Sequence, residues 1–199
     1  MSLLIRVHRL YHWSKLKSNQ YSTMHGTTII GIKMAGKAAI AGDGQVTLDD
    51  MVFKAGAKKV RKIDDHDVLV GFAGSAADGL ALLQRFEEKL SEYNGNIPRA
   101  SVELAKDWRT DRYLRRLEAM IIVISRDHCY TLSGNGDVVE PDDGICAIGS
   151  GAGYALAAAR AIISCKNAPK EPAEIVERSL EIASKICIYT NENITVLKL

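Results

Sequence analysis

The chain has 199 residues, of which 47% are apolar and 25% are charged, and it carries 26 basic and 24 acidic side chains. This length and composition predict one globular domain with a sizeable core, and they exclude disordered, collagen-like and disulfide-framework proteins. No stretch approaches the roughly 18–20 apolar residues of a membrane span, so we expect none. The four cysteines form no CxxC pair, which predicts reduced, buried thiols at Cys129, Cys146, Cys165 and Cys187.

The charges are unevenly distributed along the chain. Residues 1–26 hold four basic side chains and no acidic one, whereas residues 27–199 hold 22 basic and 24 acidic side chains. The first segment is also amphipathic and hydroxylated, which is typical of a mitochondrial transit peptide; the alternative is a basic disordered tail. We therefore expect residues 1–26 to be a removable transit peptide or propeptide and residues 27–199 to be a single domain. Because the basic excess lies outside that domain, no nucleic-acid partner is expected.

The first half of the domain is predicted to hold two strand pairs and a helix. Apolar runs predict strands over 27–33 and 38–41 around a tight turn, and over 59–63 and 68–72 around a polar turn. Ser75, three residues before Asp78, is typical of a helix N-cap. The helix that follows is expected to end at Asn94 and to bury four residues at helical spacing, namely Leu80, Leu83, Phe86 and Leu90.

The second half of the domain is predicted to hold three helices and four strands. A helix is predicted from Pro98 to about Arg116, and strands are predicted over 120–125 and 129–133. The remaining predicted elements are a strand over 145–148, helices over 154–163 and 172–186, and a terminal strand within 193–199. Strands and helices occur in separate runs, without βαβα alternation. This arrangement predicts an α+β fold with antiparallel sheets and helix pairs in layers.

Several common functional motifs are absent or incomplete. Residues 149–153 read GSGAG, but no βαβ unit follows them and no GxxxxGK[ST] motif occurs, so a nucleotide-binding regulator is a weak alternative. Ile148 stands where a GxSxG nucleophile motif needs glycine. Only His66 and His128 lie in the domain, which disfavours a zinc site or a Ser–His triad. We expect no organic cofactor.

Thr27 offers a chemistry that needs no histidine. If the chain is cut after Gly26, Thr27 carries a hydroxyl and a free α-amine, whose pKa of about 7.7–8.0 lets it accept the hydroxyl proton. Each residue of such a site also fits an ordinary structural role when it is considered singly. The further candidates are Lys59 as a buried ammonium, Asp43 as its partner, Gly71 as an oxyanion N–H donor and Ser150 as a proton relay.

Eight segments of the domain together resemble the proteasome-type N-terminal-nucleophile hydrolases. In chain order they are TTI at 27–29, IAGDGQ at 40–45, KKVR at 58–61, GFAG at 71–74, ELAKDWRTDR at 103–112, SGNGDVV at 133–139, AIGSG at 147–151 and ICIYTN at 186–191. They span nearly all of residues 27–199 in the family's order. The resemblance is greatest to those members whose peptidase works with a separate AAA+ ATPase.

The resemblance implies a four-layer αββα sandwich and a threonine endopeptidase. Thr27 matches the nucleophile, which is exposed by autocatalytic removal of the segment before it. Lys59 and Asp43 match the charged pair beside the threonine, Gly71 matches the oxyanion glycine and Ser150 the accessory serine. The alternative is a catalytically silent ring subunit, which would apply if the bond before Thr27 were never cut.

The resemblance also implies an assembly and a bound cation. Family members of this kind form two stacked hexameric rings, and an AAA+ ATPase uses ATP to feed them protein substrates. A cation, often sodium, is held by backbone carbonyls that match Ser184, Cys187 and Thr190, with serine at 184 where glycine is usual. Bacterial relatives carry only a very short leader, so the long basic segment favours an organelle version, located in the mitochondrial matrix. No membrane partner is expected.

Overall fold

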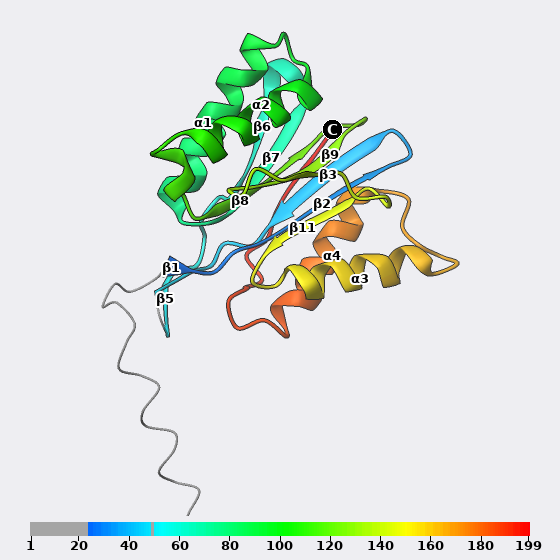
Figure 1. Cartoon of the computed structure of the whole chain (residues 1–199). Helices are drawn as coiled ribbons and strands as arrows, with labels where there is room; N and C mark the ends of the chain where they lie inside the picture. Colours follow the sequence, from blue (N-terminus) through cyan, green and yellow to red (C-terminus); the bar gives the residue numbers. More distant parts are fainter. Residues whose placement is uncertain (1–23, 49) are drawn as a thin grey trace, which may run out of the picture.

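The computed structural model describes residues 24–48 and 50–199. Two antiparallel sheets lie face to face, and a pair of helices covers each outer face, which gives four layers (Figure 1). The predicted αββα sandwich of the α+β class is therefore confirmed. Of the predicted removable segment, residues 1–23 lie outside the described residues. The helices are α1 (Ala76–Glu92) and α2 (Ile97–Thr110) on one face, and α3 (Ala152–Ser164) and α4 (Pro172–Ser184) on the other.

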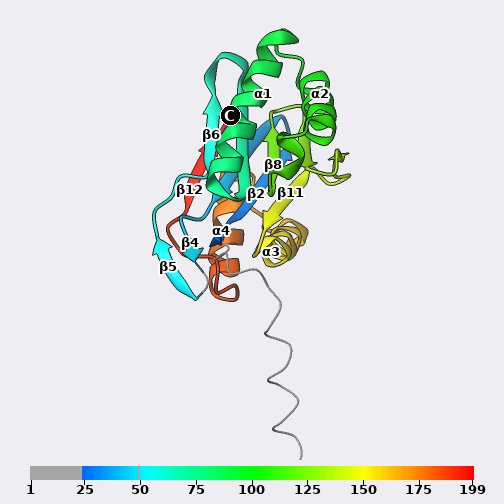
Figure 2. The same cartoon turned by 60° about the vertical axis from the view of Figure 1, so that its left-hand side comes forward.

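The strands form two large sheets and one small sheet. The four-stranded sheet has the order β11 (Ile145–Gly149), β2 (Thr28–Met34), β3 (Lys37–Gly42) and β12 (Thr195–Lys198). The five-stranded sheet has the order β10 (Val138–Val139), β9 (Cys129–Ser133), β8 (Ala119–Ile124), β7 (Val68–Gly74) and β6 (Val60–Ile63). The small sheet, at one end of the sandwich (Figure 2), has the order β1 (Met24–His25), β4 (Val46–Leu48) and β5 (Met51–Lys54).

The central strands are buried on both faces. One face of each large sheet packs against the other sheet, where Ile29, Ile40 and Ile122 are fully buried. The outer faces pack against the helix pairs, for example at Trp108 of α2 and Leu180 of α4. Because both faces need apolar side chains, β2 and β8 are nearly continuous apolar runs. These apolar runs are the reason that both strands could be predicted from the sequence.

The predicted end of the second helix differs in the structure. The second helix ends at Thr110 because Asp111 adopts an extended conformation, with ψ of 134°. The Asp111 carboxylate accepts the N–H groups of Tyr113 and Leu114, which begins a separate 3₁₀ turn over Leu114–Arg116. A second short 3₁₀ turn, Asp64–His66, joins β6 to β7. Ser75 occupies the N-cap of α1 as predicted, but its side chain makes no capping hydrogen bond.

Some side chains also lie elsewhere than predicted. Leu80 is 44% exposed, whereas Leu83, Phe86 and Leu90 are buried as expected. Cys165, at the C-terminal end of α3, is exposed, while the other three cysteines are buried and all four are free thiols. No helix in the described part of the chain is long and apolar enough to cross a lipid bilayer.

Candidate active site

Thr27 lies between β1 and β2, where the sandwich meets the small sheet. It is 5% exposed, and its hydroxyl donates a hydrogen bond to the carbonyl oxygen of Gly26. Because the chain continues through Gly26, the nitrogen of Thr27 is a peptide amide in this structure. The Gly26 carbonyl is thus the group that the Thr27 hydroxyl would attack if this bond were cut.

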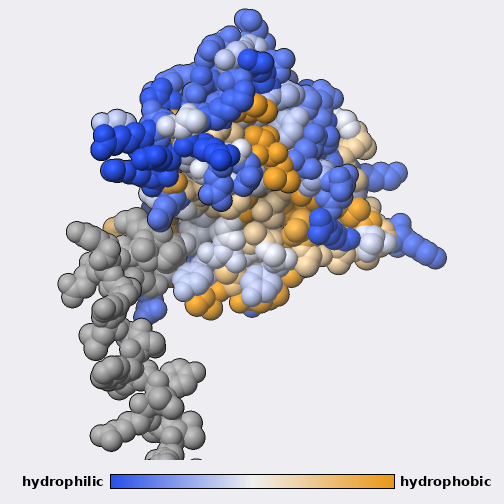
Figure 3. Space-filling model, in the orientation of Figure 1, coloured by the Kyte–Doolittle hydropathy of each residue, from blue (hydrophilic) through white to orange (hydrophobic). Residues whose placement is uncertain are grey.

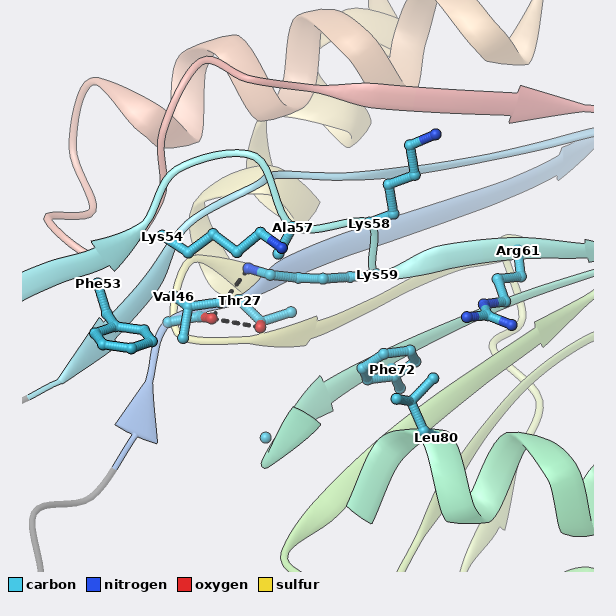
Figure 4. Close-up of a pocket in the computed structure, with 12 residues that line it drawn as sticks. Thr27, Val46, Phe53, Lys54, Ala57, Lys58, Lys59, Arg61, Phe72 and Leu80 are labelled. Carbon is cyan, nitrogen blue, oxygen red and sulfur yellow. Dashed lines mark hydrogen bonds between the residues drawn. The ribbon is translucent and has the colours of Figure 1, made fainter. Parts of the chain in front are cut away.

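Lys59 points its ammonium at the same carbonyl (Figure 4). Its Nζ lies 3.0 Å from the Gly26 oxygen and 3.2 Å from Oδ1 of Asp43, and it also donates to the carbonyl of Gln45. Lys59 is 4% exposed and Asp43 is fully buried. Burial lowers the pKa of Lys59, and the charge and hydrogen bond of Asp43 oppose this effect. The structure therefore brings Thr27, Lys59 and Asp43 together, as the sequence predicted.

The Asp43 carboxylate also fixes the chain segments around the lysine. Oδ1 accepts the N–H of Thr28 at 2.7 Å, and Oδ2 accepts those of Gln45 at 2.8 Å and Asn191 at 3.3 Å. A carboxylate has room for several such bonds, whereas an amide oxygen at the same place would accept fewer and carry no charge. Asp43 thus positions both Thr28, which follows Thr27, and the Lys59 ammonium.

Replacing Asp43 by asparagine is expected to destabilise the fold by about 3–5 kcal/mol at neutral pH, because the buried Lys59 loses its counter-charge. The pKa of Lys59 in the folded state should then fall further below its unfolded value, so the unfolded state binds more protons. The free energy of unfolding should therefore rise with pH towards about 10. Denaturant unfolding at neutral and alkaline pH measures this slope. The exposed control variant Asp65→Asn should match the wild type, and an identical slope in Asp43→Asn would contradict the account.

Gly71 is not placed beside Thr27. Its Cα faces the sandwich interior, where an added Cβ would lie 2.7 Å from Ile29 and 2.9 Å from Ile40. The N–H of the next residue, Phe72, donates to Lys59 on the β6 side, so the N–H of Gly71 points the opposite way, towards its β8 partner Ile122. This alternation excludes the predicted oxyanion role for Gly71.

Gly74 is a better candidate than Gly71 for the oxyanion donor. Its N–H points to the same side of β7 as that of Phe72, but it lies past Val60, the first residue of β6. Gly74 lines both hollows that Thr27 lines. With φ of +114°, and with an added Cβ only 2.3 Å from the Glu118 oxygen, the position requires glycine. Locating this donor needs the strand register, which the sequence pattern did not supply.

Ser150 contacts Thr27 through its backbone N–H. The N–H of Ser150 donates to the Thr27 carbonyl at 2.9 Å, and the N–H of Gly151 donates to the hydroxyl of Thr28, also at 2.9 Å. A Cβ at Gly149 would lie 2.0 Å from the Thr27 oxygen, so only glycine permits this approach. The glycine-rich turn therefore supports the threonine, and Ser150 lines one of the hollows beside it.

Two hollows meet at Thr27. The first has a volume of about 350 Å³, and the second, of about 460 Å³, extends towards Glu118, Met120 and Ser150. An extended peptide could thus lie across Thr27 with side chains on either side. The apolar walls of the first hollow include Val46, Phe53, Phe72 and Leu80. They were not predicted, because β5 shows no strand pattern in the sequence and the spacing of Leu80 predicted a core position.

The three predicted cation ligands lie at the end of α4 and in the turn after it. The Cys187 carbonyl accepts the Thr190 N–H at 3.1 Å, and the Thr190 hydroxyl lies 2.6 Å from that of Thr28. Within residues 24–48 and 50–199, no group of three or more His, Cys, Asp or Glu side chains could hold a metal ion. A cation here would therefore depend on carbonyl oxygens, which suit hard cations and lie at the negative end of a helix dipole.

Comparison with known proteins gives a consistent result. Residues 23–199 match the family described as "Proteasome subunit". The ATP-dependent protease subunit HslV of Caldicellulosiruptor saccharolyticus is 58% identical over 88% of this chain and 99% of its own length. HslV of Pseudothermotoga lettingae is 59% identical over 85% and 96%. The crystal structure of eukaryotic HslV from Trypanosoma brucei superposes with a TM-score of 0.81 at 44% identity, covering 86% of this chain and 98% of that one.

Proposed function

Because the chain belongs to the proteasome subunit family, in its HslV group, we propose that it hydrolyses peptide bonds with Thr27 as an amino-terminal nucleophile. Its relatives are named ATP-dependent protease subunits, and this chain is a proteolytic subunit of the same kind. The observation that carries the residue assignment is the buried Lys59–Asp43 pair, whose ammonium lies 3.0 Å from the carbonyl before Thr27. Replacing Thr27 by alanine tests the assignment, because hydrolysis must then be lost.

In the proposed reaction, the α-amine of mature Thr27 takes the proton of its own hydroxyl. The nearby Lys59 ammonium disfavours a second positive charge, so the amine stays neutral and basic near pH 7. The oxygen attacks the substrate carbonyl, and the N–H of Gly74 stabilises the oxyanion. The amine then gives the proton to the leaving nitrogen and an ester forms on Thr27. Water hydrolyses that ester with the same amine as base.

The same groups support self-processing of the precursor. The Thr27 hydroxyl would attack the Gly26 carbonyl carbon, while the Lys59 ammonium stabilises the charge that develops on the Gly26 oxygen. The hydroxyl proton passes to the Thr27 nitrogen as the C–N bond breaks, which leaves an ester on the Thr27 oxygen and a free α-amine. Water then hydrolyses that ester to a Gly26 carboxylate and the Thr27 hydroxyl. This cut is needed for activity, because the freed amine becomes the base of the mature enzyme.

Substituting Gly26 by alanine is expected to slow self-processing at least about tenfold. Gly26 has φ of +113°, and a Cβ there would lie 2.9 Å from the Thr47 hydroxyl, so alanine must displace the carbonyl that is attacked. A time course of intact masses measures the cut. Gly36→Ala is the matched control, because Gly36 also has a positive φ but has open space around it. Equal rates of self-processing in the Gly26→Ala variant and the wild type would show that the position of the Gly26 carbonyl does not control the cut.

The proposal extends to assembly and partners. The subunit would work in two stacked six-membered rings and receive unfolded proteins from an HslU-type AAA+ ATPase, which consumes the ATP. Apolar residues that a monomer leaves exposed support burial between subunits (Figure 3), since they gather between the helix layers and at the lower margin of one face. On the small sheet and after α4, such residues include Phe53 at 62% and Ile188 at 79% exposure.

The proposal also includes a bound cation and a location in the cell. A sodium or similar cation would be held by the carbonyls of Ser184, Cys187 and Thr190, which order the turn beside Thr28. The protein would act in the mitochondrial matrix, and support for this location comes from the basic, acid-free composition of residues 1–26.

A further inference from the structure

Two thiols that the proposed reaction does not use lie side by side inside the sandwich. Cys129 in β9 is fully buried and Cys146 in β11 is 3% exposed, and their Sγ atoms are 2.7 Å apart. β9 belongs to the five-stranded sheet and β11 to the four-stranded sheet. We propose that Cys129 and Cys146 are a redox site, at which hydrogen peroxide forms a disulfide that joins the two sheets.

The geometry requires little movement. The two sulfurs already approach more closely than atoms in ordinary van der Waals contact, and a disulfide needs them at about 2.05 Å. β11 is an edge strand of its sheet, paired on one side only by β2. An edge strand can shift slightly without breaking a second ladder, so the bond can close while the core stays packed around it.

The surroundings of the pair assign a role to each thiol. The hydrogen bond from Cys129 lowers the pKa of Cys146, an effect that burial opposes. The same hydrogen bond and burial raise the pKa of Cys129. Cys146 is 3% exposed and lies in an edge strand, so it is closer to solvent than the fully buried Cys129. Cys146 therefore provides the attacking thiolate, and Cys129 is the resolving thiol.

The chemistry balances with peroxide as the only co-reactant. The Cys146 thiolate attacks one peroxide oxygen and breaks the O–O bond, which gives a sulfenic acid and, after protonation, one water. The Cys129 sulfur then attacks the Cys146 sulfur, loses its proton and displaces the hydroxyl as a second water. Two thiols are oxidised by two electrons in total, and one hydrogen peroxide is reduced to two waters.

A disulfide here would link strands that the sequence separates by a surface turn and β10. It would also fix β11, whose far end leads into the turn that carries Ser150 to Thr27. Inter-sheet disulfides stabilise other β-sandwiches in the same way. We expect oxidation to raise the apparent melting temperature by about 5 °C, and reduction to reverse the rise.

The test uses the full-length chain, purified under reduction and treated with hydrogen peroxide at neutral pH. After catalase stops the reaction, the chain is denatured, alkylated with iodoacetamide and weighed intact, and its non-reduced peptides are mapped. We expect two of the four cysteines to escape alkylation, and a peptide that joins Cys129 to Cys146. Cys129→Ala and Cys146→Ala should each lose the cross-link and the rise in melting temperature.

Cys165→Ala is the matched control, because this thiol is exposed and is not part of the proposed pair. This variant should keep both the cross-link and the rise in melting temperature. The peptide map of the wild type decides the question even if a core variant folds poorly. Alkylation of both Cys129 and Cys146 after peroxide treatment would overturn the proposal, as would cross-links that involve only Cys165. A rise in melting temperature that persists in Cys129→Ala would also overturn it.

Discussion

Replacing Thr27 by alanine is expected to lower peptide hydrolysis by at least about 10³-fold, because the variant has no hydroxyl to form the ester intermediate. The chain should begin at residue 27, so that the loss of self-processing is not confused with the loss of hydrolysis. Cleavage of a fluorogenic peptide and of unfolded casein, with an HslU-type ATPase and ATP present, measures the effect. Gel filtration should show that assembly is unchanged, since the substitution alters one small side chain between β1 and β2.

Thr27→Ser is the control for this substitution, because serine keeps both the hydroxyl and the α-amine on one residue. It should retain substantial activity, although loss of the methyl group frees its side-chain rotamer. Hydrolysis by the alanine variant at the rate of the wild type would show that Thr27 is not the nucleophile. Loss of activity in the serine variant would point to packing of the methyl group as the critical property.

Replacing Lys59 by methionine is expected to lower both hydrolysis and self-processing by about 10²–10⁴-fold. Methionine keeps much of the buried length but removes the ammonium that lies 3.0 Å from the Gly26 oxygen. It also leaves the Asp43 carboxylate buried without its counter-charge, which costs stability. The double variant Lys59→Met with Asp43→Asn removes both charges, so it should recover part of the lost stability but none of the lost activity.

Lys62→Met is the matched control, because Lys62 lies on β6 three residues after Lys59, is exposed and pairs with the surface carboxylates of Asp64 and Asp67. It should process and hydrolyse like the wild type. Activity should be compared per folded, assembled subunit, which separates catalysis from stability. If the double variant regained activity together with stability, Lys59 would have a structural role and no catalytic one.

Most of the fold could be predicted from the sequence because the central strands are apolar on both faces. The hairpin of β2 and β3, with positive φ at Ala35 and Gly36, follows from a run of apolar residues around a small-residue turn. β5 could not be predicted in this way, because all four of its residues are exposed and show no alternation of burial. Only the structure shows that Phe53 of β5 lines the pocket beside Thr27.

The site was predictable where the chemistry depends on side-chain type. Thr27, Lys59 and Asp43 could be proposed because a hydroxyl, an ammonium and a carboxylate have few reasons to occur together in apolar surroundings. The oxyanion donor is a backbone N–H, and its direction depends on strand register. The sequence contains both Gly71 and Gly74 in one GFAG segment, and the hydrogen bond from Phe72 to Lys59 shows which way each N–H points.

Leu80 illustrates a further limit of periodicity. It occurs at helical spacing with three core residues of α1, yet it faces the first hollow beside Thr27. An apolar side chain that contacts a substrate and one that contacts the core have the same pattern in the sequence. The difference depends on how the start of α1 is placed relative to β7, which the topology determines.

The intact mass of the mature protein, combined with its amino-terminal sequence, tests the central claim most directly. The account predicts that the mature chain begins at Thr27 and that an electrophilic peptide vinyl sulfone adds its mass to that residue. A chain that keeps the Gly26–Thr27 bond would have an amide in place of the catalytic amine. It would then be a silent ring subunit, and that result would contradict the account.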